Sequence, residues 1–258
     1  MTAKNGRKRI IILASLVIIL GLASFGMLGL LISFGGPEPL RPATYPNEPG
    51  FQSAIIWFEL AASKQEVFQI LGDPKDQQGV HIRQVMDKTD VYDYGYMVLY
   101  SLMCFFILAL IFYLNQNKPG AAAKTWILYV SAFMCIAMLA GDAMENVQLL
   151  KLTKYASVAD VDDAVVTALN IWTRVKWGAI FIFTIVAAYE YFVYFYGKKI
   201  PQALFVIAYG SSAVLGMVSL SAMSMRYLAE TASYLVALSW LVSIVHAGIV
   251  LKSTVAGK

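Results

Sequence analysis

Two carboxylates and a carboxamide, Asp142, Glu145 and Asn146, interrupt an otherwise apolar run over residues 126–150. Spaced at i, i+3 and i+4, they share one face of a helix. A helix of this length and apolarity is predicted to cross a bilayer, where polar side chains need a partner within the protein. Buried carboxylates of this kind can hold a cation, a proton or a polar ligand, or act as a general base.

Candidate partners for these side chains occur at a similar depth in other predicted spans. They are Asp93, Tyr96 and Tyr100 in the second span, Asn170, Arg174 and Lys176 in the fourth, and Arg226 at the end of the fifth. An unpaired charge in a bilayer costs at least about 2.5–3.5 kcal/mol, so the carboxylates are expected to pair with these cations. We predict that Asp142 or Glu145 pairs with Lys176 or Arg174. Those two cations are about 200° apart around their helix, so they cannot serve one partner equally.

The composition places the chain among membrane proteins. Hydrophobic residues make up 59% of the 258 residues and charged residues 14%, whereas soluble domains average about 25% charged residues. Six apolar stretches reach or approach the length that spans a bilayer. We predict an all-α fold, a six-helix transmembrane bundle that forms one integral membrane domain over residues 1–258. The predicted spans are residues 10–34, 92–114, 125–150, 165–196, 202–225 and 231–251.

Residues 35–91 are predicted to form a loop with an amphipathic helical cap on the outer, non-cytoplasmic side of the bundle. Within this segment, residues 51–71 have a broad apolar face, typical of a helix that lies on the bundle or at the lipid headgroups. Trp57 beside this face indicates a helix at the lipid headgroup level or over the mouth of the bundle. Ser63 followed by Glu66 matches a capping box, which predicts the start of a second short helix. The alternative is a cap that only packs on the bundle.

Basic residues determine the predicted orientation. A cytoplasmic N-terminus followed by six alternating spans puts ten basic residues on the cytoplasmic side. They are Lys4, Arg7, Lys8, Arg9, Lys118, Lys124, Lys198, Lys199, Lys252 and Lys258. Glu190 is the only acid in the sequence near that side, which agrees with the positive-inside rule. We therefore expect a multi-pass protein with both termini cytoplasmic. A cleaved signal peptide is the alternative for residues 10–34, although its apolar core would be shorter.

The sequence carries no signature of a cofactor, metal or nucleic-acid site. No HExxH, phosphate-binding glycine-rich loop or GxSxG motif occurs. His81 and His246 fall at different depths, so they cannot ligate one haem, and His246 is interpreted as a helix-packing residue. Cys104 and Cys135 lie within predicted spans and are expected to behave as small apolar side chains. Aromatic residues over 189–196 indicate an interfacial belt. We expect no cofactor, no bound metal and no nucleic-acid partner.

Several short motifs resemble those of a group of uncharacterised bacterial multi-span integral membrane proteins. They are Phe58-Glu-Leu-Ala61, Gln69-Ile-Leu-Gly72, Asp93-Tyr94, Asp142-x-x-Glu-Asn146 and Lys176, and the likeness covers about residues 50–180. The resemblance implies that the outer helices and spans two to four form a shared unit, to which Glu59 belongs with the polar residues above. We accordingly expect the bacterial plasma (inner) membrane. No activity is implied.

Three classes of function fit these features. The leading prediction is a binding or accessory protein, whose outward-facing polar pocket holds a lipid or small molecule or docks a partner. The second is a small secondary transporter that uses the carboxylate–cation cluster, although neither broken helices nor inverted repeats are evident. The third is a membrane enzyme acting on a lipid or isoprenoid, with Asp142 or Glu145 as general base. The polar residues can also serve only to join helices by hydrogen bonds. Expected partners are membrane lipid and a partner membrane protein or a second copy of the chain.

Overall fold

The computed structural model describes residues 3–36, 51, 53–116 and 125–257, and every regular element within these ranges is a helix. The α-helices are α1 (Ala3–Ser33), α2 (Ala54–Glu59), α3 (Lys64–Leu71), α4 (Gln77–Gln116), α5 (Trp126–Leu152), α6 (Asp163–Tyr194), α7 (Lys199–Ser221) and α8 (Leu228–Val255). Short 3-10 turns, η1 (Val158–Asp160) and η2 (Met223–Met225), precede α6 and α8. The all-α prediction is confirmed for these residues. The proline-rich residues 37–50 and the connection at 117–124 lie outside the described ranges.

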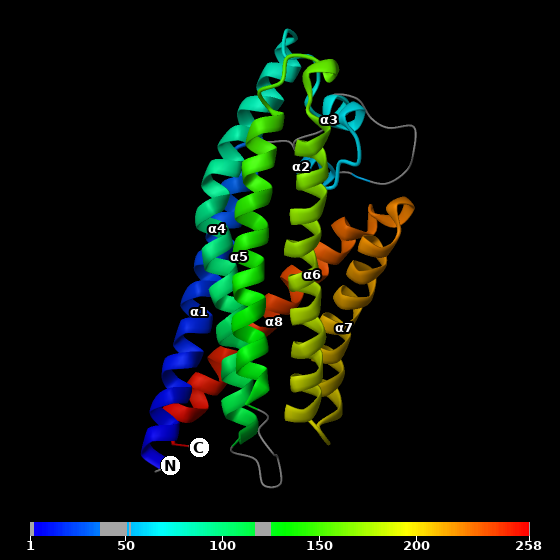
Figure 1. Ribbon diagram of the computed structural model, residues 1–258. Coiled ribbons are helices and arrows are strands. Elements are labelled where there is room, and N and C mark those ends of the chain that lie inside the picture. Colours follow the sequence, from blue (N-terminus) through cyan, green and yellow to red (C-terminus); the bar gives the residue numbers. More distant parts are fainter. Residues whose placement is uncertain (1–2, 37–50, 52, 117–124, 258) are drawn as a thin grey trace.

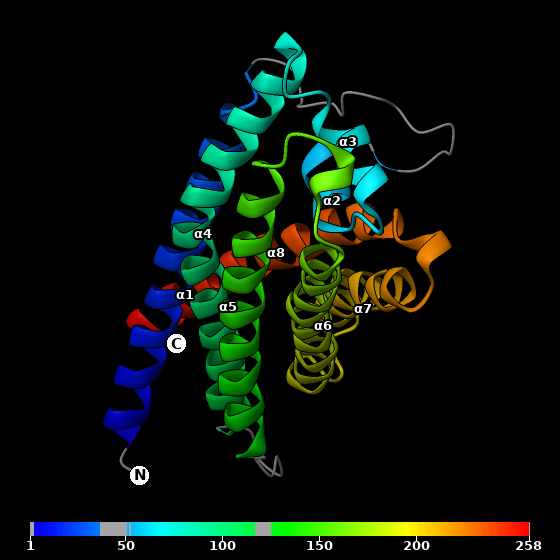
Figure 2. The ribbon, with the colours of Figure 1, turned by 45° about the horizontal axis from the view of Figure 1, so that its top comes forward.

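Six of the described helices are long and apolar enough to cross a membrane, as predicted. They form a ring in the order α1, α4, α5, α6, α7 and α8, and α8 returns to α1 (Figures 1 and 2). Large apolar side chains such as Ile19, Phe133 and Ile249 are more than half exposed on the outside of this ring. An apolar outer surface of this kind is the surface that a bilayer covers.

Helix α4 is much longer than the span predicted for it. Its 40 residues give a length of about 60 Å at 1.5 Å per residue, about twice the thickness of a hydrocarbon core. Residues 77–91 were predicted to belong to a loop, and that prediction is wrong because they form the first turns of α4. Ile82, Val85 and Met86 share one face of these turns and are buried, so packing against α2 and α3 holds the polar segment in a helix.

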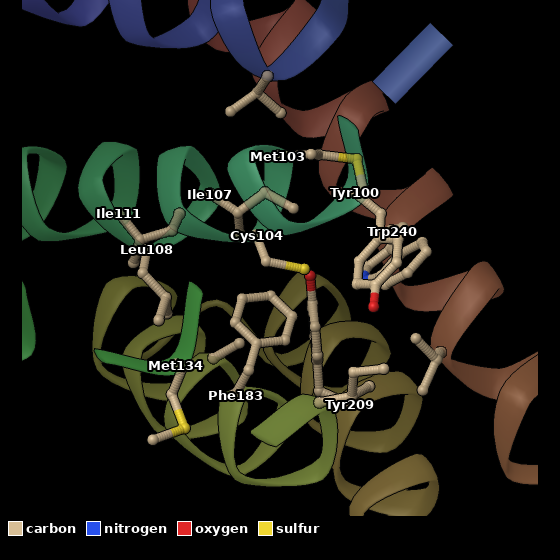
Figure 3. Close-up of a cluster of buried hydrophobic side chains, with 14 of the residues drawn as sticks. Tyr100, Met103, Cys104, Ile107, Leu108, Ile111, Met134, Phe183, Tyr209 and Trp240 are labelled. Atoms are coloured by element: carbon tan, nitrogen blue, oxygen red, sulfur yellow. The ribbon is translucent and has the colours of Figure 1, made fainter. Parts of the chain in front are cut away.

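The buried apolar side chains form two separate cores. The membrane core fills the interior of the ring, where Tyr100, Met103, Phe183, Tyr209 and Trp240 meet from α4, α6, α7 and α8 (Figure 3). The rings of Tyr100 and Trp240 stack with their centroids 5.5 Å apart and so connect α4 to α8. The head core lies around α2 and α3 and contains these buried residues: Phe51, Trp57, Phe58, Val67, Ile70, Leu71, Ile82, Met86, Leu149, Leu152, Val166 and Leu169.

Two short helices replace the single amphipathic helix that the 51–71 pattern suggested. Ser63 accepts a hydrogen bond from the backbone N–H of Glu66 (3.2 Å), which confirms the predicted start of a second helix, α3. The Glu66 carboxylate accepts in turn from the backbone N–H of Ala62 (2.9 Å). Of the two places predicted for Trp57, the lipid headgroups are excluded, because the residue is 2% exposed and stacks on Phe51 within the head core. Its burial assigns α2 to the packed protein rather than to lipid.

Both termini lie at the end of the bundle opposite to α2 and α3 (Figure 1). The turn between α6 and α7, with Lys198 and Lys199, lies at the same end as the termini. At this end Tyr189, Phe192 and Tyr196 are between 44% and 77% exposed, as an interfacial belt requires. The other aromatic side chains of the predicted belt differ, because Tyr191 and Phe195 are buried and pack around His246. The packing role predicted for His246 is therefore confirmed.

Candidate functional site

Lys176 of α6 lies at the centre of a buried ionic cluster. Its ammonium Nζ is 3.0 Å from Glu59 Oε2, 3.4 Å from Asp142 Oδ1 and 2.5 Å from Glu145 Oε2. The side chains are 7% exposed for Lys176, 12% for Glu59, 3% for Asp142 and 0% for Glu145. The predicted pairing of Asp142 and Glu145 with Lys176 is confirmed, and both carboxylates contact the ammonium group. In the low dielectric of a protein interior such pairs interact more strongly than in water.

A glycine brings α5 and α6 close enough for these contacts. A Cβ atom at Gly141 would lie 2.6 Å from the backbone nitrogen of Lys176 and 2.9 Å from its Cα. Small residues at such positions let two membrane helices approach closely. Because Asp142 and Glu145 follow on the same turn of α5, the close approach at Gly141 delivers both carboxylates to Lys176.

Hydroxyl and indole groups hold the carboxylates in place. Tyr100 donates a hydrogen bond to Asp142 Oδ2 at 2.6 Å, and the Trp177 indole N–H donates to Glu59 Oε2 at 3.0 Å. The Thr173 hydroxyl lies 2.7 Å from Glu145 Oε1 and 2.9 Å from the carbonyl oxygen of Glu59. It has one hydrogen to donate to these two acceptors. Helices α2, α4, α5 and α6 therefore all contribute to one polar network.

Further carboxyl groups extend this network along α4. The Asn146 amide donates to Asp93 Oδ2 at 2.8 Å, so the predicted members Asp93 and Asn146 pair with each other. Asp90 is one turn earlier on the same face and is 4% exposed. Its Oδ2 atom has no hydrogen-bond partner among the described residues. Asp90 and Asp93 both interact electrostatically with Glu59 and Lys176. We call Glu59, Asp90, Asp93, Asp142, Glu145 and Lys176 the Lys176 cluster.

The segment that joins α2 to α3 is attached to the bundle through its backbone. Asn170 donates to the carbonyl oxygen of Ala61 (2.9 Å), and Arg226 donates to that of Leu60 (3.1 Å). Arg226 also pairs with Glu66 at 2.5 Å. The last carbonyl groups of a helix lack partners within the helix. For α2, Thr173 binds the carbonyl oxygen of Glu59, and Asn170 and Arg226 bind those of the next two residues, which places Glu59 over Lys176.

A small pocket lies between α6 and α7, next to the Lys176 cluster. Its lining residues are Leu60, Asn170, Thr173, Arg174, Ser219, Leu220 and Arg226. The volume of about 10 Å³ holds about one water molecule or one oxygen of a larger group. Arg174 is exposed and makes no ion pair or hydrogen bond with the described residues. We call this cavity the Arg174 pocket.

The sequence-predicted residues thus fall into two neighbouring groups. The Lys176 cluster contains these predicted residues: Glu59, Asp93, Asp142, Glu145 and Lys176. Tyr100 and Asn146 donate hydrogen bonds to its carboxylates. Tyr96 contacts Tyr100, with ring centroids 5.2 Å apart. The Arg174 pocket contains Asn170, Arg174 and Arg226.

Two expected ion pairs do not form. Arg174 was a candidate partner for Asp142 or Glu145, but its side chain is exposed on another face of α6. Arg226 was expected to face the carboxylates at similar depth, and it pairs with Glu66 of α3 instead. The close contact at Gly141 admits only the face of α6 that carries Lys176, which excludes Arg174. Arg226 lies between η2 and α8, where it reaches Glu66.

Asp90 is the member of the cluster that sequence reasoning missed. The predicted span began after it, at residue 92, so Asp90 was assigned to a loop. A signal was present, because Asp90 and Asp93 are three residues apart and share a helix face.

Comparison with known proteins adds no relative. No family model, no curated protein and no solved structure matches the chain. The geometry of the two groups is therefore what any function has to be inferred from.

Proposed function

We propose that this chain is a multi-pass binding protein of the bacterial inner membrane that holds an anionic group, such as a lipid phosphate, in the Arg174 pocket. The termini are cytoplasmic in this proposal, and α2 and α3 cap the outer side. Support for the orientation comes from the basic residues at one end of the bundle, including Arg7, Lys8, Lys198 and Lys252. Such residues remain preferentially in the cytoplasm.

The depth of Arg174 favours a headgroup ligand. The exposed aromatic residues around Phe192 mark one membrane boundary on α6. A hydrocarbon core corresponds to about 20 helical residues, and counting back by that length from Phe192 leads to the region of Trp172. Arg174 therefore lies close to the outer boundary, where lipid phosphates are. Lys176 lies slightly deeper.

The observation that carries this proposal is the exposed guanidinium of Arg174, without an ion-pair partner among the described residues, beside a polar cavity. An unpaired charge is costly near hydrocarbon. Guanidinium groups bind phosphate through two parallel hydrogen bonds. Asn170, Thr173 and Ser219 also line the cavity, but they donate their hydrogens within the protein. Among the described residues, Arg174 is therefore the side chain there with free donors. One phosphate oxygen fits the cavity while the rest of the lipid remains on the surface of the ring.

Native mass spectrometry of the full chain in mild detergent tests this proposal. We expect phosphatidylglycerol to bind in preference to phosphatidylethanolamine, and Arg174→Gln to weaken phosphatidylglycerol binding by about tenfold or more, because a hydrogen bond to a charged group contributes about 1.5–3 kcal/mol. Lys151→Gln is the matched control, since it removes one exposed positive charge at the same end of the bundle, outside the pocket. Thermal stabilisation by inorganic phosphate would identify a free anion as the ligand. Equal effects of Arg174→Gln and Lys151→Gln on lipid binding would contradict the proposal.

A secondary transporter is the second candidate, and the Lys176 cluster favours it because buried carboxylates paired with a cation are typical of ion pathways. A membrane enzyme has less support. Asp142 and Glu145 are 3% and 0% exposed and both contact Lys176, so neither is free to accept a proton from a substrate in this arrangement. The resemblance to bacterial multi-span proteins over residues 50–180 fits either binding or transport.

A further inference from the structure

The Lys176 cluster contains many more acids than bases. Five carboxyl groups share the interior with a single ammonium group, and full ionisation would leave a net charge of −4. The ionisable groups that face the cluster are Glu59 from α2, Asp87, Asp90, Asp93, Tyr94, Tyr96 and Tyr100 from α4, Asp142 and Glu145 from α5, and Lys176 from α6. Asp87 is neutralised locally, because Lys154 and Thr153 both bind it.

Such an excess of buried negative charge is not stable. Where two carboxylates share one buried site, one of them keeps its proton, because like charges cannot both ionise at short distance. Lys176 offsets one negative charge of the five. The others must be neutralised by a bound cation or by protons.

The geometry favours protons over a metal ion. Among the described residues, no group of three or more His, Cys, Asp or Glu side chains is arranged to hold a metal. The carboxylate oxygens are directed instead toward Lys176 and toward neutral donors: Tyr100 for Asp142, Thr173 for Glu145 and Asn146 for Asp93. Each of these three carboxylates accepts a hydrogen bond.

Asp90 is the exception among the buried acids. Asp90 is 4% exposed, and its charge interacts with the charges of Asp93, Glu59 and Lys176. Its Oδ2 atom has no donor among the described residues. An ionised carboxylate left in this state would carry the full cost of burial without a compensating hydrogen bond. A protonated carboxyl group at Asp90 carries no charge, so it avoids the cost of a buried carboxylate without a donor. Glu59 differs again, because it is the most exposed of the acids that contact Lys176 and it belongs to α2.

We infer that the Lys176 cluster is a proton-binding site in which Asp90 holds a proton. The ligand is the proton itself, and binding consists of its transfer from water to a carboxylate oxygen, with no change in oxidation state. None of the six cluster residues lines the Arg174 pocket, and Thr173 is the residue that contacts both.

Infrared spectroscopy of the purified full chain in detergent tests the inference. The carbonyl band of protonated carboxyl groups is separate from the carboxylate bands, and we expect it to be present at neutral pH and to disappear at alkaline pH. Asp90→Asn should remove about one carboxyl group from this band at neutral pH. Asp87→Asn is the matched control on the preceding turn of α4 and should leave the band unchanged.

A second measurement keeps the test decisive if Asp90→Asn does not fold. The wild-type chain alone should show the band at neutral pH and lose it at alkaline pH. A wild-type spectrum without this band at neutral pH, or equal losses in the Asp90 and Asp87 variants, would overturn the inference. A band that sodium chloride abolishes at constant pH would also overturn it, because the site would then bind a metal cation.

Discussion

At the scale of single residues, Lys176 has the largest expected effect on stability. Its ammonium group contacts three carboxylates that are each at least 88% buried, since the most exposed of them is Glu59 at 12%. Breaking a buried ion pair by removing one partner costs about 3–5 kcal/mol, because the other charge stays buried without compensation. Lys176→Met keeps the length of the side chain and removes the charge. We expect a loss of this size in the free energy of unfolding, measured by denaturant titration in detergent with tryptophan fluorescence.

Lys64→Met is the control for this prediction. Lys64 pairs with Asp163 at 3.2 Å, but the Asp163 side chain is 80% exposed. Solvent-exposed pairs contribute at most about 1 kcal/mol. If Lys64→Met and Lys176→Met lowered stability equally, burial would not be the reason for the effect.

The sequence predicted that Asp142 or Glu145 pairs with Lys176 or Arg174, but it did not show which of the two cations is the partner. The spacing of Asp142 and Glu145 specified one helix face and the membrane required a counter-charge, which limits the choice to a few cations. Which cation is chosen depends on how α6 is rotated about its own axis. That rotation is set by the contact between Gly141 and the Lys176 backbone, and neither helix reveals it alone.

At the scale of elements, the contact between α5 and α6 is the one that positions the cluster. Gly141→Ala would place a Cβ 2.6 Å from the Lys176 backbone nitrogen, where no side-chain rotation can relieve the overlap. The helices must separate, and overpacking of this kind costs about 1–3 kcal/mol. We expect lower stability in the same denaturant titration, together with a change in the fluorescence of the neighbouring Trp177.

Gly178→Ala provides the matched control on α6. A Cβ atom at Gly178 meets nothing within 4 Å, and alanine has a higher helix propensity than glycine by up to about 1 kcal/mol. We therefore expect unchanged or slightly higher stability for this variant. A destabilising Gly178→Ala would mean that glycine is needed for reasons other than the close approach of α5.

Helix positions were easier to predict than helix lengths. The apolar runs mark the six long helices because a bilayer requires about 20 consecutive apolar residues. The first turns of α4 do not meet this criterion, because one side of the helix is polar there. Their signal is the amphipathic spacing of Ile82, Val85, Met86 and Thr89, all buried in the structure. The place of Trp57 was left open between lipid and bundle for a related reason, because an aromatic residue beside an apolar face fits either lipid or a protein core.

At the scale of the whole molecule, the ring divides into a membrane core and a head core, with the Lys176 cluster between them. The sequence supports six spans but does not indicate their order around the ring. That order depends on long-range contacts such as the stacking of Tyr100 on Trp240, which joins helices far apart in the chain (Figure 3). The polar cluster lies at the level where α4 and α2 leave the membrane core, so it is partly shielded by protein rather than by lipid.

The orientation of the whole molecule leads to the last prediction. His81 on the first turns of α4 and Lys198 in the turn after α6 are both exposed, and they lie at opposite ends of the bundle. Cys104 and Cys135 are buried, free thiols, so their replacement by alanine gives a background without reactive cysteine. With the basic end in the cytoplasm, His81→Cys should react with a membrane-impermeant maleimide in intact cells.

Lys198→Cys should react only after the cells are permeabilised, and each variant serves as the control for the other. The opposite labelling pattern would place α2, α3 and the Arg174 pocket in the cytoplasm, and the outer-leaflet lipid would no longer be a candidate ligand. Labelling of both sites in intact cells would contradict a single fixed orientation. Four of the six long apolar helices found among the described residues precede Lys198, so Lys198 lies on the same side as the N-terminus. A cytoplasmic Lys198 is therefore incompatible with termini on the outside.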